Sequence, residues 1–531
     1  MTRSWKVTKV GSEPRGEAFR HRLRARQRTV EEPLRPSDTY ESLAMLKPPG
    51  LCRPRRRIRM ADFRVEKDFL GEVKVPKDAY WGVQTQRAIE NFPISGIRFG
   101  RRFIYALGLI KMACAQTNVE LGLLDSKIGK ATVQACQEVM DGKLDAQFPL
   151  DIFQTGSGTS TNMNANEVIA NRANEILGHP LGEKGPVHPN DHVNMGQSSN
   201  DVIPTAIHVA ALLEIDQSLL PALRELEDSL ARKAKDFDPI VKAGRTHLMD
   251  ATPIRLGQEF SGYQSQIDHG IRRVSAARAA LAELAIGGTA VGTGINAHPD
   301  LPGRVVEKIS AATNTKFRVA DNHFEAQAAR DALVEASGAI RTVAISMMKI
   351  ANDLRWLGSG PHTGLRELNL PAVQPGSSIM PGKVNPVIPE AVMQVGVTVI
   401  GNDVAIAVAN THSNLDLSTM MPVMSQRIQQ NVELLANVAR VFAHKCIDGI
   451  TANVDVLQRY AESSPAIATK LNPIIGYEKA AEIAKEAGLT GKTVKQLVIE
   501  KGILSPEEAE KVLDPRHLTS PSKDMLGGGG G

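Results

Sequence analysis

Residues 201–235 read DVIPTAIHVAALLEIDQSLLPALRELEDSLARKAK, and their apolar side chains recur three and four positions apart. This spacing predicts one long helix with a broad apolar face, because an α-helix turns once every 3.6 residues. The stretches 101–122, 325–357 and 420–446 show the same periodicity. Helices of this length must bury their apolar faces against one another. The sequence therefore predicts a mainly α fold around a long central helical bundle.

Other elements are sparse. Short strands are expected only near 67–81 and 287–294, without alternating strands and helices and without a dinucleotide-binding fingerprint. A chain of 531 residues is too long for one simple core. We expect a basic disordered leader (1–59), an N-terminal domain (60–197) and a central bundle domain (198–450). A small C-terminal helical domain (451–518) and a flexible Gly-rich tail (519–531) are expected to follow.

The formal net charge of +5 comes from the leader, where arginine is abundant, so the rest of the chain is slightly acidic. The basic balance therefore gives no indication of nucleic-acid binding. Arginine richness is typical of a mitochondrial transit peptide, but such peptides are poor in acid, and the leader contains Glu13, Glu17, Glu31 and Glu32. We favour translation from Met60 and a cytoplasmic protein.

The cysteines lie far apart, without the paired spacing that holds zinc or an iron–sulfur cluster. They are Cys52, Cys114, Cys136 and Cys446. The most apolar window, Val392–Ala409, contains Asn402 and Asp403, which are costly in lipid. We expect a reduced compartment, no metal, no cofactor and no transmembrane segment.

Two polar loops each lead into a helical pattern. Loop 1 (residues 155–162) reads TGSGTSTN, and loop 2 (residues 197–201) reads QSSND. Glycines let backbone amides approach a ligand, hydroxyls add donors, and a helix N-terminus favours an anion. The alternative is simple helix capping, with Ser199 or Asn200 bonding the first free amides of the helix.

Two further loops carry groups suited to proton transfer and carboxylate binding. Loop 3 (residues 244–253) reads GRTHLMDATP, where Asp250 and Pro253 suit a helix start and His247 is free to titrate near neutral pH. Loop 4 (residues 376–386) reads GSSIMPGKVNP. It lacks the spacing and the Ser or Thr of a nucleotide-binding P-loop, so we interpret it as a loop that closes over a substrate.

These four loops together resemble the fumarase/aspartase superfamily, whose signature is loop 4. The resemblance extends from about Met60 to about Leu518. At three positions the residue is similar to that of class II fumarases rather than to that of aspartate ammonia-lyases. These residues are His247, Ser157 and His188. The resemblance implies the superfamily's mainly α fold, a homotetramer with a 20-helix core, and active sites that each draw loops from three chains.

The resemblance also implies roles for individual residues. Ser377 is expected to take the proton from C3 of malate, His247 to act as acid through a water, and Glu390 to polarise His247. The expected substrate ligands are Ser157, Gly158, Thr159, Ser198, Ser199, Asn200, Thr246, Ser378, Lys383, Val384 and Asn385.

A second anion site is implied at four consecutive residues, His188, Pro189, Asn190 and Asp191. The basic residue that the family has three places earlier is Gly185 here, with Lys184 as a possible substitute. The segment superficially resembles a metal site, but its ligands are too few.

The expected reaction is the reversible hydration of fumarate to malate in the tricarboxylic acid cycle, through an aci-carboxylate dianion that Lys383, Asn385 and helix-start amides stabilise. Two alternatives stay open. Aspartate ammonia-lyases share the fumarate product, and some proteins of this scaffold are non-catalytic lens crystallins.

Overall fold

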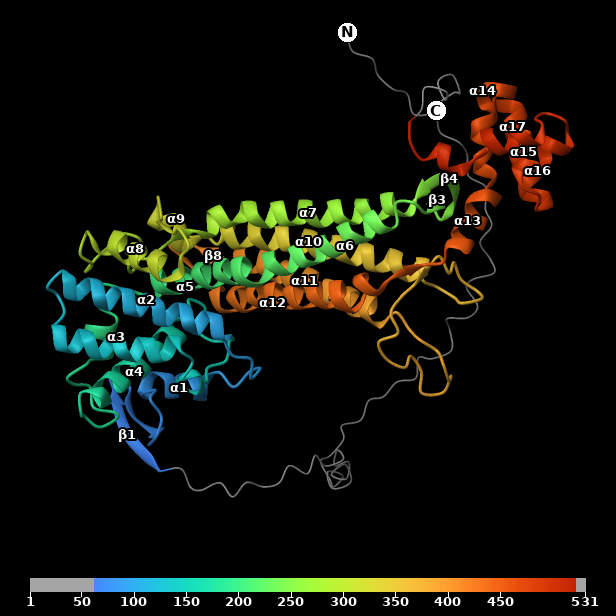
Figure 1. Cartoon of the computed structure of the whole chain (residues 1–531). Helices are drawn as coiled ribbons and strands as arrows, with labels where there is room; N and C mark the ends of the chain where they lie inside the picture. Colours follow the sequence, from blue (N-terminus) through green and yellow to red (C-terminus); the bar gives the residue numbers. More distant parts are fainter. Residues whose placement is uncertain (1–61, 522–531) are drawn as a thin grey trace, which may run out of the picture. The chain divides into compact units, whose positions relative to one another are not determined.

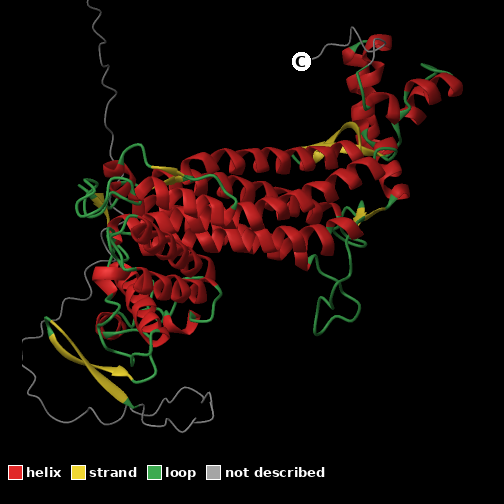
Figure 2. Ribbon diagram, turned by 60° about the vertical axis from the view of Figure 1, so that its left-hand side comes forward, coloured by secondary structure: helices red, strands yellow, loops and turns green. Residues whose placement is uncertain are grey.

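The computed structural model describes residues 62–521. The leader 1–59 and the glycine run 527–531 lie outside the described residues. Within the described part, helices dominate and strands form only two-stranded sheets (Figures 1 and 2). The prediction of a mainly α fold is confirmed.

Long helices packed side by side form the central bundle (Figure 1). They are α5 (Ser199–Glu214), a π-helical turn (Ile215–Leu219), α6 (Leu220–Asp236), α7 (Leu256–Leu281), α10 (Asp331–Leu357), α11 (Val387–Asn410) and α12 (Met421–Lys445). Helix α10 packs against α7 and α11, and α6 packs against α7 and α12. One hydrophobic core joins them, with Leu226, Phe260, Ile340 and Val432 fully buried.

Helices α5 and α6 continue into each other as one helical rod of 38 residues, Ser199–Asp236. The π-helical turn lies just before Pro221, whose missing N–H cannot complete the regular hydrogen-bond ladder. At a rise of 1.5 Å per residue the rod is about 57 Å long. The residues just before Ser199 and the residues just after Asp236 therefore lie at opposite ends of this rod.

The N-terminal part of the described chain packs on α5 through α2 and α4. Strands β1 and β2 pair antiparallel, in the region where a strand was predicted. The elements are β1 (Phe63–Asp68), β2 (Gly71–Pro76), α1 (Val83–Asn91), α2 (Arg101–Glu120), α3 (Ser126–Met140), a 3₁₀ turn (Asp145–Gln147), α4 (Thr159–Ile176) and a π turn (Pro189–Val193).

Two local predictions were wrong. Asp250 and Pro253 do not start a helix, because β3 (Val241–Thr246) and β4 (Met249–Arg255) form an antiparallel hairpin there and α7 begins at Leu256. Residues 287–294 form turns rather than a strand, with positive φ at Gly287, Thr289, Gly292 and Gly294.

Short elements surround the bundle. They are β5 (Glu283–Leu284) paired with β6 (Arg318–Val319), α8 (Leu301–Thr313), α9 (His323–Ala328), β8 (Ser413–Asn414) paired with β9 (Leu417–Ser418), a 3₁₀ turn (Ile447–Gly449), and β7 (Leu368–Asn369) paired with β10 (Thr451–Ala452).

The C-terminal helices have a hydrophobic core of their own, which includes Ile467, Leu471 and Leu497. Thr519, at the start of the predicted tail, is buried, and its carbonyl accepts a hydrogen bond from Gln258. The helices are α13 (Val454–Ser463), a 3₁₀ segment (Pro465–Leu471), α14 (Asn472–Ile475), α15 (Tyr477–Thr490), α16 (Val494–Glu500), α17 (Pro506–Val512) and a 3₁₀ turn (Pro515–Leu518). The domain boundaries at 197 and 450 stay predictions.

Helix α11 is apolar yet poorly covered. Like the α5–α6 rod, it is long and apolar enough to cross a membrane by length and composition, but only 33% of its apolar window is buried, against 72% in the rod. Asn402 and Asp403 attach its buried face to α12 and α10 through side-chain hydrogen bonds. Val397, Val404 and Val408 are more than half exposed along another face. A stripe of this kind marks an interaction surface.

Candidate active site

Loops 1 and 2 lie against each other at one end of the bundle. The Asn162 amide in α4 donates to Ser199 Oγ in α5 at 3.0 Å. Ser157 Oγ and Thr159 Oγ1 are 2.7 Å apart, and the side chain of Ser157 is buried. The N-termini of two helices thus meet here with several hydroxyls between them, an arrangement that favours an anion.

Glycine is required at two positions of loop 1. A Cβ on Gly156 would lie 1.9 Å from the carbonyl oxygen of Thr419, just before α12. Gly158 has φ of 73°, and a Cβ there would lie 3.0 Å from Ile203 of α5. These close approaches attach loop 1 to α5 and to the start of α12.

Loop 2 does cap α5, although the capping residue differs from the prediction. Ser198, rather than Ser199 or Asn200, is the N-cap: its Oγ accepts from the backbone N–H of Asn200 at 3.2 Å, and its own N–H donates to the Asp201 carboxylate at 2.9 Å. The Asn200 side chain donates to the Ala290 carbonyl at 2.7 Å. The Ser199 hydroxyl therefore does not cap the helix and instead accepts the hydrogen bond from the Asn162 side chain.

Loop 3 presents His247 at the tip of the β3–β4 hairpin. His247 and Leu248 have φ of 57° and 60°, and Thr246 pairs with Met249, which defines a two-residue hairpin turn with left-handed residues. Such backbone is uncommon for residues other than glycine, asparagine, aspartate and histidine, so Leu248 is the unusual residue of the turn. Thr246, His247 and Leu248 are all exposed, so the turn points away from its own chain.

Loop 4 is closed at its base and open at its tip. The Gly376 N–H donates to the Lys383 carbonyl at 2.8 Å, and the Asn385 amide donates to the Gly376 carbonyl at 2.6 Å. Ser377 Oγ accepts hydrogen bonds from the backbone N–H groups of Ile379 and Met380, at 3.2 and 3.0 Å. Two amide donors on one hydroxyl oxygen favour its alkoxide form.

The remaining predicted ligands of loop 4 differ in exposure. Ser378, Lys383 and Val384 are exposed, Asn385 is half-buried, and one N–H of its amide is used within the loop. Glu390 is half-buried in the first turn of α11. Among the described residues, no hydrogen bond or ion pair joins Glu390 to His247, or loop 3 to loop 4.

The chain does not bring the four loops together. Loop 1 packs on Thr419, beyond the C-terminal end of α11, whereas loop 4 precedes its N-terminal end. The 24 residues of α11 span about 36 Å. Loop 2 and loop 3 lie at opposite ends of the α5–α6 rod (Figure 1). A four-carbon dicarboxylate is far shorter than either distance, so one chain cannot supply all the predicted ligands to one substrate.

A buried ion cluster links β3 to the segment that leads into loop 4. Glu367 is fully buried, 2.9 Å from Lys242 Nζ and 2.6 Å from a guanidinium nitrogen of Arg245. Lys242 also contacts Glu259 at 2.7 Å. This cluster, which sequence reasoning missed, fixes the strand that carries His247.

The residues predicted to form a second anion site lie in a compact π turn, with His188 as its N-cap. His188 Nδ1 accepts from the N–H groups of Asn190 and Asp191, at 3.3 and 3.1 Å, and Pro189 is the first residue of the turn. His188, Pro189, Asn190 and Lys184 line a cavity of about 50 Å³. The ammonium of Lys184 donates to the Lys67 carbonyl at 2.9 Å. Whether Lys184 replaces the missing basic residue stays a prediction.

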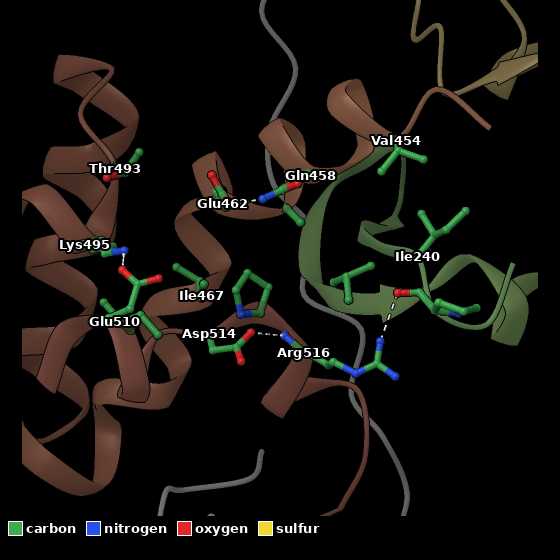
Figure 3. A pocket seen from close by; sticks show the side chains of 15 residues that line it. Ile240, Val454, Gln458, Glu462, Ile467, Thr493, Lys495, Glu510, Asp514 and Arg516 are labelled. Atoms are coloured by element: carbon green, nitrogen blue, oxygen red, sulfur yellow. Dashed lines mark hydrogen bonds and ion pairs between the residues drawn. The ribbon is translucent and has the colours of Figure 1, made fainter. Parts of the chain in front are cut away.

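A larger cavity, of about 610 Å³, lies between the start of β3 and the C-terminal helices (Figure 3). Its walls carry Ile240, Glu462, Lys495 and Glu510, and Arg516 donates to the Pro239 carbonyl at 2.9 Å. None of the predicted site residues lines it. Its size alone does not make it the candidate site.

Comparisons with known proteins identify the family of the chain. Residues 71–401 match the Lyase family, and residues 467–520 match the Fumarase C C-terminus family. The chain is 56% identical over 459 residues to the class II fumarate hydratase of Mycobacterium tuberculosis, which covers 86% of this chain and 95% of that protein. It is 57% identical over 458 residues to the class II fumarate hydratase of Halobacterium salinarum, and this match covers 86% of this chain and 97% of that protein.

Solved structures show the same fold. A class II fumarase from Schistosoma mansoni superposes with a TM-score of 0.84 at 38% identity, over 87% of this chain and 100% of that chain. A fumarate lyase:delta crystallin from Brucella melitensis, solved bound to cobalt, also superposes with a TM-score of 0.84. It is 44% identical, over 87% of this chain and 100% of that chain.

Proposed function

The chain belongs to the class II fumarate hydratase family of lyases, and from that premise we propose that its active sites form between chains of a homotetramer. The reaction is the reversible addition of water to fumarate, giving (S)-malate. The observation that supports shared sites is the position of loops 1 and 2 at the opposite end of α11 from loop 4.

The bundle offers a surface for this assembly. The exposed valines of α11 would be buried against a second copy, which places loop 4 of one chain beside loops 1 and 2 of another when the helices run antiparallel. Closed symmetric oligomers bury such self-complementary surfaces. A third chain then supplies the hairpin with His247.

In the assembled site, Ser377 takes the proton from C3 of malate. Malate is already a dianion, and proton removal puts further negative charge on the neighbouring carboxylate. The amides of Ile379 and Met380 stabilise the alkoxide of Ser377 and so increase the fraction of Ser377 in the form that can accept the proton. Lys383 and the N-terminal amides of α4 and α5 stabilise the aci-carboxylate.

His247 then protonates the departing hydroxyl through a water. Its place at an exposed turn lets it reach a neighbouring chain, where Glu390 orients its imidazole. Ser157, Thr159 and Ser199 donate to the substrate carboxylates. In the direction of hydration the same two groups act in reverse order.

The purified full-length chain should convert malate to fumarate, seen as rising ultraviolet absorbance, in buffer that contains a chelator. Aspartate offered under the same conditions should give no fumarate, because His247 occupies the place of the glutamine of aspartate ammonia-lyases. Fumarate formation from aspartate alone, or from neither substrate, would contradict the proposed function. Loss of the malate reaction on chelation would contradict metal independence only.

A further inference from the structure

A buried lysine lies directly behind loops 1 and 2. Lys111, in the middle of α2, is 0% exposed. Its ammonium donates to Asn194 Oδ1 at 2.8 Å and to Gln197 Oε1 at 2.9 Å. Both acceptors are neutral amides, and among residues 62–521 no carboxylate lies within 4.0 Å of the ammonium. Lys111 is thus a buried cation without a direct counter-ion.

Such a charge is costly, because burial removes its hydration and neutral amides return only part of that free energy. Burial lowers the pKa of Lys111 to about 8, against the opposing effects of Cys114, Asp201 and Cys136. Burial raises the pKa of both thiols, that of Cys114 to about 12, so they stay neutral. At neutral pH the ammonium form therefore predominates.

The buried acid Asp201 acts on Lys111 only from a distance, without an ion pair within 4.0 Å. Asp201 accepts hydrogen bonds from the backbone N–H groups of Ser198, Gly287 and Thr289, at 2.9 to 3.0 Å. The π turn that also packs against α2 carries Asp191, which is exposed and lies beside His188, and His192, whose pKa burial lowers. Neither side chain compensates Lys111.

Lys111 is connected to loop 2 through two asparagines. Asn194 Oδ1, which accepts from Lys111, also accepts from the Asn162 amide at 3.3 Å, and that amide donates to Ser199 Oγ at 3.0 Å. These contacts put the ammonium within about 9 Å of Ser199 Oγ, and so about 12 Å from a carboxylate bound there, close enough for a Coulombic effect of about 10-fold in affinity per unit of ligand charge at an effective dielectric near 20.

We propose that Lys111 is a positioning residue whose ammonium orders residues 194–197 and has the bound substrate dianion as its missing counter-ion. This inference rests on the proposed function, because it requires a dicarboxylate at loops 1 and 2. It extends the binding site beyond the side chains that touch the substrate, to a buried charge one layer behind them.

Two variants of the full-length enzyme separate charge from hydrogen bonding. Lys111→Met removes both, and Lys111→Gln removes the charge but keeps a donor for Asn194. The probes are two inhibitors of similar shape, succinate with two charges and succinamate with one. Both variants should raise the inhibition constant of succinate by up to about 100-fold and that of succinamate about 10-fold, because the Coulombic effect scales with ligand charge.

The control is Lys308→Met, which removes a lysine of α8 that pairs with Glu120 at 2.6 Å and should change neither constant. Lys111→Met should unfold at a lower temperature than Lys111→Gln, because methionine leaves the side-chain oxygens of Asn194 and Gln197 without this donor. Equal weakening of both inhibitors, or no weakening, in whichever variant folds would overturn the role of Lys111. Absence of malate turnover in the wild type would instead refute the proposed function.

Discussion

Ser377→Ala is expected to lower kcat for malate dehydration by about 100- to 10,000-fold, the usual contribution of a positioned base. The hydroxyl oxygen is the only part of Ser377 that can accept the C3 proton. Alanine removes it together with its hydrogen bonds from the Ile379 and Met380 N–H groups, but keeps the hydrogen bonds between Gly376, Lys383 and Asn385 that close the base of loop 4. Initial rates of fumarate formation measure the effect, and light scattering shows whether the assembly is intact.

The control for this change is Ser126→Ala, at an exposed position in the first turn of α3, which should keep the wild-type rate. A Ser377→Ala enzyme with near-normal turnover would mean that another group takes the proton. Loss of assembly in that variant would show that loop 4 acts structurally.

His247→Asn is expected to lower kcat about 100-fold or more, the usual contribution of a positioned general acid. The structure makes asparagine the suitable replacement, because His247 has φ of 57° and asparagine tolerates left-handed backbone in a two-residue hairpin turn. The hairpin should therefore persist, so that the loss reports the missing acid.

A comparison with His517→Asn, at an exposed site near the C-terminus, separates this effect from the general loss of a histidine. Thermal unfolding of His247→Asn should match or exceed that of the wild type. Full turnover in His247→Asn would leave His247 as an ordinary surface residue.

The long helices could be predicted because their apolar periodicity persists over many turns. Residues 101–122, 201–235 and 420–446 coincide closely with α2, the α5–α6 rod and α12. The stretch 325–357 contains α9 and α10, separated at Ala329 and Arg330. Periodicity shows that a helix exists but does not reveal so short an interruption.

The β3–β4 hairpin could not be predicted because its turn lacks the usual signal. Hairpin turns with left-handed residues favour asparagine and glycine, whereas this one holds His247 and Leu248. Asp250 and Pro253 also satisfied the pattern of a helix start, and pairing across the hairpin overrode it.

The candidate site divides in a similar way. The ligands in loops 1 to 4 could be named from motifs, but Lys111 could not, because a lysine within an apolar helix is usually explained by exposure of its ammonium. Only its complete burial beside Asn194 and Gln197 indicates a role.

Hybrid tetramers made from Ser377→Ala and His247→Asn chains test the shared site most directly. If each site takes these two residues from different chains, random mixing in equal amounts restores both intact groups to about a quarter of the sites, by the symmetry of the assembly. Hydratase activity near a quarter of the wild-type value is the expected result. If the mixture is no more active than its two parents, one chain supplies both residues and the proposed architecture is wrong.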